Sequence, residues 1–97
     1  MRQIEKEMLA AIKYGRDWAK DNTRVVHDLD YREFTDVYLH GHRIATVVAG
    51  DYLKASVRVD VDTLRQWPTR TTMSRLRALG VDVCTRKGEV LLNGETL

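Results

Sequence analysis

The apolar residues of this chain follow a helical period near the N-terminus. In residues 1–22, apolar and small side chains recur at spacings of three and four, which defines one face of a helix (Ile4, Met8, Ala11, Ile12, Gly15, Trp18 and Ala19). A glycine inside a helix is costly unless another element packs tightly against it. We therefore expect Gly15 to mark where a long N-terminal helix crosses a sheet, and Trp18 to be the main anchor of that helix.

The middle of the chain alternates apolar and polar residues, which is typical of half-buried strands. A short strand is expected at residues 23–27, a connection at 28–33, and the main antiparallel strands at 34–62, with turns at Gly41 and at residues 50–51. The alternation predicts this core face: Val37, Leu39, Ile44, Val48, Leu53, Val57, Val59 and Val61. It assigns to the opposite face Tyr38, His40, Arg43 and Ala45.

Residues 67–80 combine the signals for a helix start and a helix stop. Pro68 fixes its own backbone angle, and Thr71 or Thr72 supplies a side-chain oxygen for the helix N-terminus. Gly80 stands where a left-handed C-terminal cap is needed. This predicts a short second helix at residues 71–80, followed at 81–93 by a hairpin with strands at 81–85 and 89–92 and a basic tip.

These elements predict an α+β fold in one domain, residues 1–97: an antiparallel sheet of five to six short strands, a long N-terminal helix and a short second helix. The apolar fraction of 43% and the charged fraction of 31% are typical of folded soluble proteins. No apolar run is long enough to span a bilayer, and the first residues are charged where a signal peptide is apolar. We therefore expect no membrane partner and a cytoplasmic location.

Charge is unevenly spread along the chain. The net charge is +2 overall, +2 for residues 1–26, −3 for residues 27–62 and +3 for residues 63–97. This polarity suits self-association as well as a foreign partner, and composition does not choose between them. Cys84 is the only cysteine, which fits a reducing compartment, and it is expected in a strand.

Few residues in the sequence point to catalysis or metal binding. His40 and His42 have a spacing that a metal site can use, but two nitrogens do not make a site, and they are expected to flank the turn. Asp60 and Asp62 share one face of the predicted strand, where paired carboxylates do acid–base work or simply face solvent. No phosphate-binding glycine loop, nucleophile elbow or Cys/His cluster is present. We therefore expect no catalytic residues, no metal, no cofactor and no enzymatic activity.

Arginines border the apolar stripe of the second helix and form a candidate contact surface. Arg75 and Arg77 fall on opposite borders of the stripe, and Arg70 lies just ahead of it. Their heads either contact an acidic or phosphate-bearing partner or simply lie in water above the core edge. Arg86 and Lys87 at the hairpin tip would add phosphate contacts in a nucleic-acid binder, and Tyr38 and His40 would add contacts to a protein.

Two segments, LHGHRIA at residues 39–45 and WPTRTTMSRLRALG at 67–80, are similar to segments of small, mostly uncharacterised proteins of tailed bacteriophages. Those proteins have an LHG-x-x-IA turn and a W-x-T-x-TT-x-x-RL segment followed by a strand pair. The chain departs from their usual pattern at Gln66, His42 and Arg77, where Gly, Asn and Asn are common. The resemblance covers residues 35–93 and implies a virus-encoded accessory protein acting in the bacterial host cytoplasm.

Two functions follow as hypotheses. The first is a non-enzymatic accessory protein that binds a host protein and inhibits or redirects it, for example a defence or transcription protein. The alternative is a small DNA- or RNA-binding protein that uses the basic helix and the basic hairpin tip. A homodimer is also expected, because Leu9, Tyr14 and Trp18 spread beyond the main stripe of the N-terminal helix.

Overall fold

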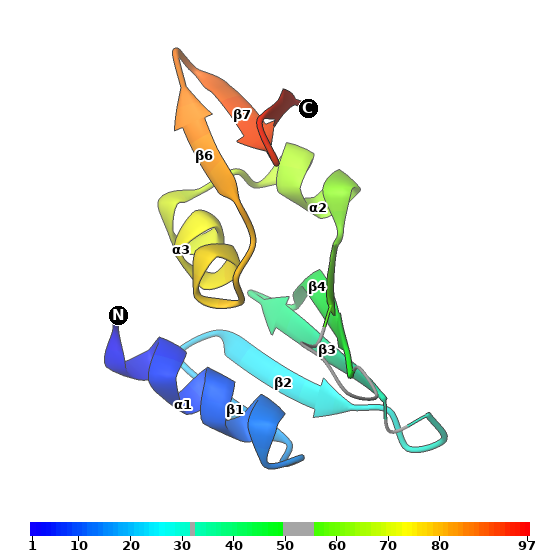
Figure 1. Ribbon diagram of the computed structural model, residues 1–97. Coiled ribbons are helices and arrows are strands. Elements are labelled where there is room, and N and C mark those ends of the chain that lie inside the picture. Colours follow the sequence, from blue (N-terminus) through cyan, green and yellow to red (C-terminus); the bar gives the residue numbers. More distant parts are fainter. Residues whose placement is uncertain (32, 50–55) are drawn as a thin grey trace.

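In the computed structural model, which describes residues 1–31, 33–49 and 56–97, the chain forms two antiparallel sheets and three helices (Figure 1). The helices are α1 (Gln3–Lys13), α2 (Val61–Gln66) and α3 (Arg70–Ala78). The strands are β1 (Trp18–Lys20), β2 (Thr23–His27), β3 (Phe34–Leu39), β4 (His42–Val48), β5 (Ser56–Val59), β6 (Val83–Arg86), β7 (Glu89–Leu92) and β8 (Glu95–Thr96). One sheet has the order β1-β2-β3-β4-β5 and the other β6-β7-β8. The α+β prediction is confirmed, with a second small sheet in addition.

The N-terminal helix is shorter than predicted because Gly15 ends it. Gly15 has a φ of 66°, a conformation that interrupts a right-handed helix. The backbone N–H of Arg16 donates to the carbonyl of Ala11 across this reversal. The chain then turns back, so that Trp18 begins β1 and pairs with Val25. The predictions of a helix over residues 1–22, of a close crossing at Gly15 and of Trp18 as the helix anchor are therefore wrong.

A β-bulge in β4 shifts the predicted core face by one residue. Val37 pairs with Ala45 and Tyr38 pairs with Arg43, which leaves Ile44 as the extra residue. Ile44 and Ala45 are both buried, and beyond them the inward positions change phase, so that Val47 is buried and Val48 only half-buried. Ala45 was predicted on the opposite face, and Val48 in the core. Strict alternation fails here because the bulge adds a residue to one strand only.

The strand predicted to run to residue 62 stops at Val59, because the next residue starts a helix. The carboxylate of Asp60 accepts a hydrogen bond from the backbone N–H of Thr63 at 3.1 Å and caps α2. Val61 and Asp62 therefore belong to a helix, although the alternating pattern predicted that they continue the strand. Leu53 and the predicted turn at residues 50–51 lie outside the described residues, as does residue 32 of the predicted connection.

The second predicted helix is confirmed as α3, with Thr69 as its cap in place of Thr71 or Thr72. The Thr69 hydroxyl accepts from the backbone N–H of Thr72 at 3.1 Å. Gly80, with a φ of 94°, ends the helix as predicted. The hairpin β6–β7 follows, with Cys84 in β6. The turn at residues 93–94 adds β8, which was not predicted although Asn-Gly is a strong hairpin signal.

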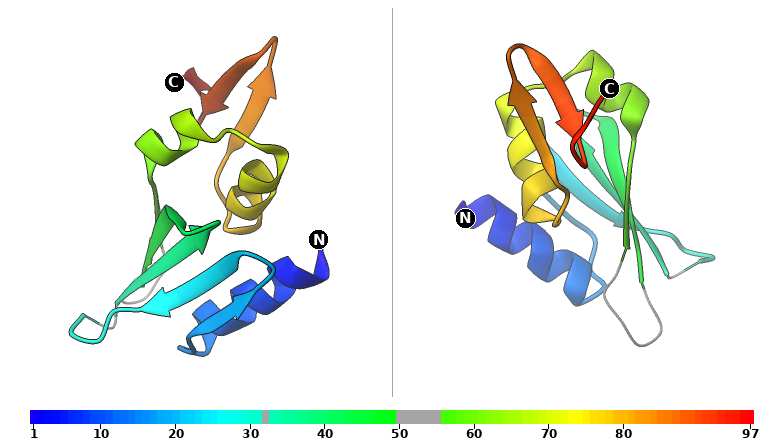
Figure 2. Two further views of the ribbon diagram at one scale, coloured as in Figure 1. Left: turned by 180° about the vertical axis from the view of Figure 1, so that it is seen from behind. Right: turned by 45° about the horizontal axis from the view of Figure 1, so that its top comes forward.

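The core lies between the inner face of the five-stranded sheet and the helices α1 and α3. Figure 2 shows α3 between the five-stranded sheet and the hairpin β6–β7, which projects away from the body. The buried apolar residues are Met8, Ala11, Val25, Val37, Leu39, Ile44, Ala45, Val47, Leu64, Met73, Leu76 and Val83. Every helix contributes to this set. α3 contacts β4 of the first sheet and β6 of the second, so it links the two sheets.

Candidate functional site

Arg75, predicted on an exposed rim, is buried in an ion pair. Its Nη1 donates to Glu5 Oε2 at 2.8 Å, and its Nε donates to the Thr23 hydroxyl at 3.1 Å. The side chains of Arg75 and Glu5 are only 5% and 4% exposed. The Ser74 hydroxyl also donates to Glu5 Oε2, at 2.6 Å. Arg75 therefore joins α3 to α1 and β2 and is not available for contacts at the surface.

Glu5 is ionised in this network. Burial raises the pKa of Glu5, but the hydrogen bonds from Ser74 and Arg75, together with the charge of Arg75, hold the pKa below its ordinary value of 4.5. The carboxylate charge neutralises the guanidinium charge inside the core. The sequence offered no signal for this pair, because Glu5 stands on the apolar side of a helix without any pattern to distinguish it from a surface acid.

Two other predicted arginines do meet at the surface, and a third joins them. Arg70 and Arg77 of α3 line one hollow together with Arg2, which precedes α1, and with Ser74 and Thr85. We call this the arginine hollow. Arg77 Nε donates to the carbonyl of Val83 at 2.9 Å, which orients its guanidinium. Arg86 ends β6 next to Thr85, and Lys87 lies in the adjoining turn. Arg2 was missed because it lies 66 positions or more from its neighbours in the hollow.

Tyr38 and His40 lie elsewhere, on the hairpin β3–β4. Tyr38 is half-buried, and His40 is exposed in the turn with a φ of 53°. His40 lines a small pocket of about 180 Å³ with His42, Trp67 and three threonines of the α3 N-terminus and its cap. The rings of His42 and Trp67 stack there with their centroids 3.9 Å apart. His40 therefore lines a different opening from the arginine hollow, and Tyr38 lines neither.

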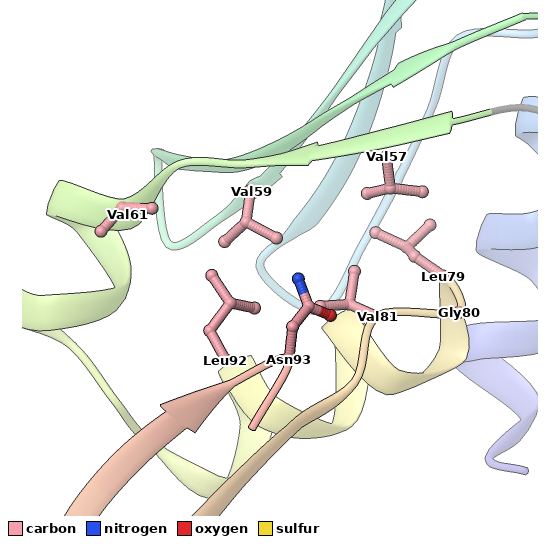
Figure 3. A pocket seen from close by; sticks show the side chains of 8 residues that line it. All are labelled: Val57, Val59, Val61, Leu79, Gly80, Val81, Leu92 and Asn93. Carbon is pink, nitrogen blue, oxygen red and sulfur yellow. The ribbon is translucent and has the colours of Figure 1, made fainter. Parts of the chain in front are cut away.

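A cleft lined mostly by valine and leucine side chains lies between β5 and the C-terminal sheet, with a volume of about 680 Å³. We call it the apolar cleft. In Figure 3, Val57 and Val59 of β5 point toward Leu79, Val81 and Leu92 on the opposite wall. All five side chains are half-buried. The sequence had placed Val57 and Val59 in the core, whereas the structure leaves them with one side toward this opening.

The acidic pair Asp60 and Asp62 does not share a strand face. Asp60 caps α2 and lies 3.5 Å from Arg43, whereas the Asp62 side chain is 91% exposed. The hydrogen bond from the Thr63 backbone, more than the nearby Arg43, holds the pKa of Asp60 below its ordinary value of 3.8. Among residues 1–31, 33–49 and 56–97, no three His, Cys, Asp or Glu side chains are grouped to hold a metal ion.

The surface from which a homodimer was predicted is divided in the structure. Leu9 packs against the core, Trp18 lies on β1, and Tyr14, at the end of α1, is 65% exposed. These residues do not form one apolar face of a helix, and the homodimer stays a prediction. No helix within the described part of the chain is both long and apolar enough to cross a membrane.

Comparison with known proteins gives one match. Residues 1–96 match the family model of the Kyanoviridae Gp96 protein. No curated protein and no solved structure matches the chain. The match includes α1, which lay outside the phage resemblance of residues 35–93. The chain belongs to the Kyanoviridae Gp96 family of bacteriophage proteins.

Proposed function

We propose that this phage protein acts in the host cytoplasm by binding a host protein, whose extended segment pairs with the edge of β5 and fills the apolar cleft. The binding inhibits or redirects that protein, for example a defence or transcription protein. The observation that carries the proposal is the apolar cleft itself. Its five apolar side chains are half-buried around an open volume of about 680 Å³, and openings of this size are usual binding sites.

The backbone of β5 supports an extended occupant. β5 is the last strand of the five-stranded sheet and pairs on one side with β4. The Asp60 backbone N–H donates toward β4, to the carbonyl of Ile44 at 2.9 Å. Because backbone groups in an antiparallel strand alternate in direction, the N–H and C=O groups of Val57 and Val59 point away from β4. An incoming strand would bond these groups and direct alternate side chains into the cleft.

Acids outnumber bases among the residues that adjoin the lining of the apolar cleft, where Arg58 is the one base, and this balance favours a basic partner over a second copy of this chain. Asp62 follows Val61, Asp82 follows Val81, and Glu95 pairs opposite Leu92, so each acid adjoins a residue that lines the cleft. Two copies joined here would bring like charges together, which weakens an interface. A segment with alternating apolar and basic residues matches both the walls and the margin.

A matched pair of variants tests the cleft. Leu92 lines it, whereas the neighbouring Leu91 is not among the residues that pack against the core and lies on the other face of β7. Wild type and Leu91→Asp should capture the same host protein from nuclease-treated lysate, and Leu92→Asp should not. Equal capture by both variants, or loss of all binding after nuclease treatment, would refute the proposal, and the second result would support the nucleic-acid alternative.

A peptide probe tests the strand geometry directly. A synthetic peptide of alternating valine and lysine should slow amide hydrogen exchange at Val57 and Val59, and the same peptide with proline at its centre should not. Light scattering tests whether a second copy of this chain, instead of a host protein, occupies the apolar cleft. A dimer that dissociates on Leu92→Asp would show that a second copy occupies the apolar cleft and would overturn the proposed partner.

A further inference from the structure

The arginine hollow concentrates positive charge without a balancing acid. Arg2, Arg70 and Arg77 all line it, and none of them forms an ion pair within the described ranges of the chain. The nearest acid in the network described above, Glu5, is already neutralised by Arg75 at 2.8 Å. The hollow therefore carries the field of three guanidinium groups, which attract anions and repel each other until an anion is bound.

Two further features orient this charge. The bond from Arg77 Nε to the Val83 carbonyl uses one donor and leaves the two terminal nitrogens of the guanidinium for a ligand. α1 begins next to Arg2, and no side chain caps its N-terminus, so the positive end of the helix dipole adds to the same region. The hydroxyl proton of Ser74 is donated to Glu5, which leaves Thr85 as the neutral hydroxyl donor of the hollow.

The shape of the hollow indicates what kind of anion fits. Its volume of about 640 Å³ exceeds the needs of a single small ion and lies within the range of nucleotide-sized ligands. Arginine forks match the oxygens of phosphate in paired hydrogen bonds. We infer that the arginine hollow binds the phosphate group of a nucleotide, either free or within a nucleic-acid strand. The arginine hollow shares no lining residue with the apolar cleft, and the inference does not depend on the function proposed for the cleft.

The test is a titration of the full chain, followed by nuclear magnetic resonance at the Arg77 side chain and the Thr85 backbone amide. The probes are inorganic phosphate, adenosine monophosphate and a single-stranded oligothymidylate. Saturable shifts at both positions are expected with the nucleotide ligands. Tighter binding of the oligothymidylate than of the monophosphate would identify the strand as the source, and equal affinities would identify the free nucleotide. With three phosphate contacts, the logarithm of strand affinity should fall with the logarithm of salt with a slope of about −2.

A matched pair of variants makes the test specific. Arg70→Gln should weaken nucleotide binding about tenfold, the usual order for one charge-assisted hydrogen bond. Arg65→Gln removes the same charge from α2, where Arg65 lies 3.8 Å from Asp62 and does not line the hollow, and it should leave the affinity unchanged. Neither side chain is buried, so both variants should fold, which thermal melting checks. Absence of saturable shifts with every probe, or equal weakening by both variants, would overturn the inference.

Discussion

Arg75→Met removes the cation of the buried ion pair and leaves the Glu5 carboxylate without its partner. Both side chains are almost completely buried, at 5% and 4% exposure, so water cannot replace the lost contact. Removing one member of such a pair typically costs about 3–5 kcal/mol. A domain of this length loses about 4–8 °C of Tm for each kcal/mol, so we expect Tm to fall by about 12–40 °C.

The pH dependence of the same variant changes sign. In the wild type, the folded pKa of Glu5 lies below its ordinary value of 4.5, so the contribution of Glu5 to stability is present at neutral pH and is lost as the pH falls through the folded pKa. Arg75→Met removes both effects of Arg75 that lower the pKa of Glu5, and burial, the largest single cause, then raises the folded pKa against the hydrogen bonds from Ser74 and Arg2 alone. The Glu5 contribution in the variant should then favour folding at low pH and be lost as the pH rises through the raised pKa.

Guanidinium unfolding followed by circular dichroism, repeated at several pH values, measures both effects. Lys20→Met is the control, because it breaks an exposed ion pair with an acid of the same helix, α1. Lys20 Nζ lies 3.0 Å from Glu7, and the two side chains are 47% and 35% exposed. Breaking such an exposed pair costs no more than about 1 kcal/mol. If Arg75→Met costs no more than Lys20→Met, or if its stability responds to acid as the wild type does, the reasoning about the buried pair is wrong.

Three smaller predictions concern the backbone. Val57→Pro should destabilise the chain less than Arg58→Pro in guanidinium unfolding, because only Arg58 directs its N–H to β4; equal losses would contradict the orientation of β5. Gly80→Ala should cost about 1–2 kcal/mol in thermal melting, because a Cβ disfavours the φ of 94° even though nothing lies within 4 Å of it. Asp60→Ala should cost about 1 kcal/mol at neutral pH through the loss of the α2 cap. The difference in stability between wild type and Asp60→Ala should vanish in acid. The folded pKa of Asp60 is lowered, so the stability that Asp60 contributes is lost as the pH falls through that pKa.

Local signals in the sequence predicted the elements that depend on neighbouring residues. The hairpin at Gly41, the stop at Gly80 and the strand at Glu89–Leu92 follow from turn chemistry and alternation over a few positions. The failures share a different cause. Gly15 fits a helical period and a helix end equally well, and the choice depends on whether β1 can pair with β2.

The candidate sites were harder to predict because they depend on residues far apart in the chain. The alternating pattern predicts Asp60 as a solvent-facing strand residue, and only the hydrogen bond from the Thr63 backbone shows that it caps a helix. The bulge at Ile44 has no signal in the sequence. The partnership of Arg75 with Glu5 and the approach of Arg2 to Arg70 need the packing of α1 against α3. No spacing rule reaches across such separations, so an arginine rim was predicted where one arginine is buried and two form a hollow.

The Glu5–Arg75 pair also determines when the packing of the first helix can be completed during synthesis. The two residues are 70 positions apart, so the ribosome must make about three quarters of the chain before the partner of Glu5 exists. At about 5–20 residues per second, this takes on the order of 4–14 s. During that interval the Glu5 carboxylate stays hydrated, and Met8 and Ala11 have no α3 to pack beside. A truncated chain that ends before Arg75 can therefore pack α1 against β1 and β2 only, and the emergence of α3 completes the burial of that helix.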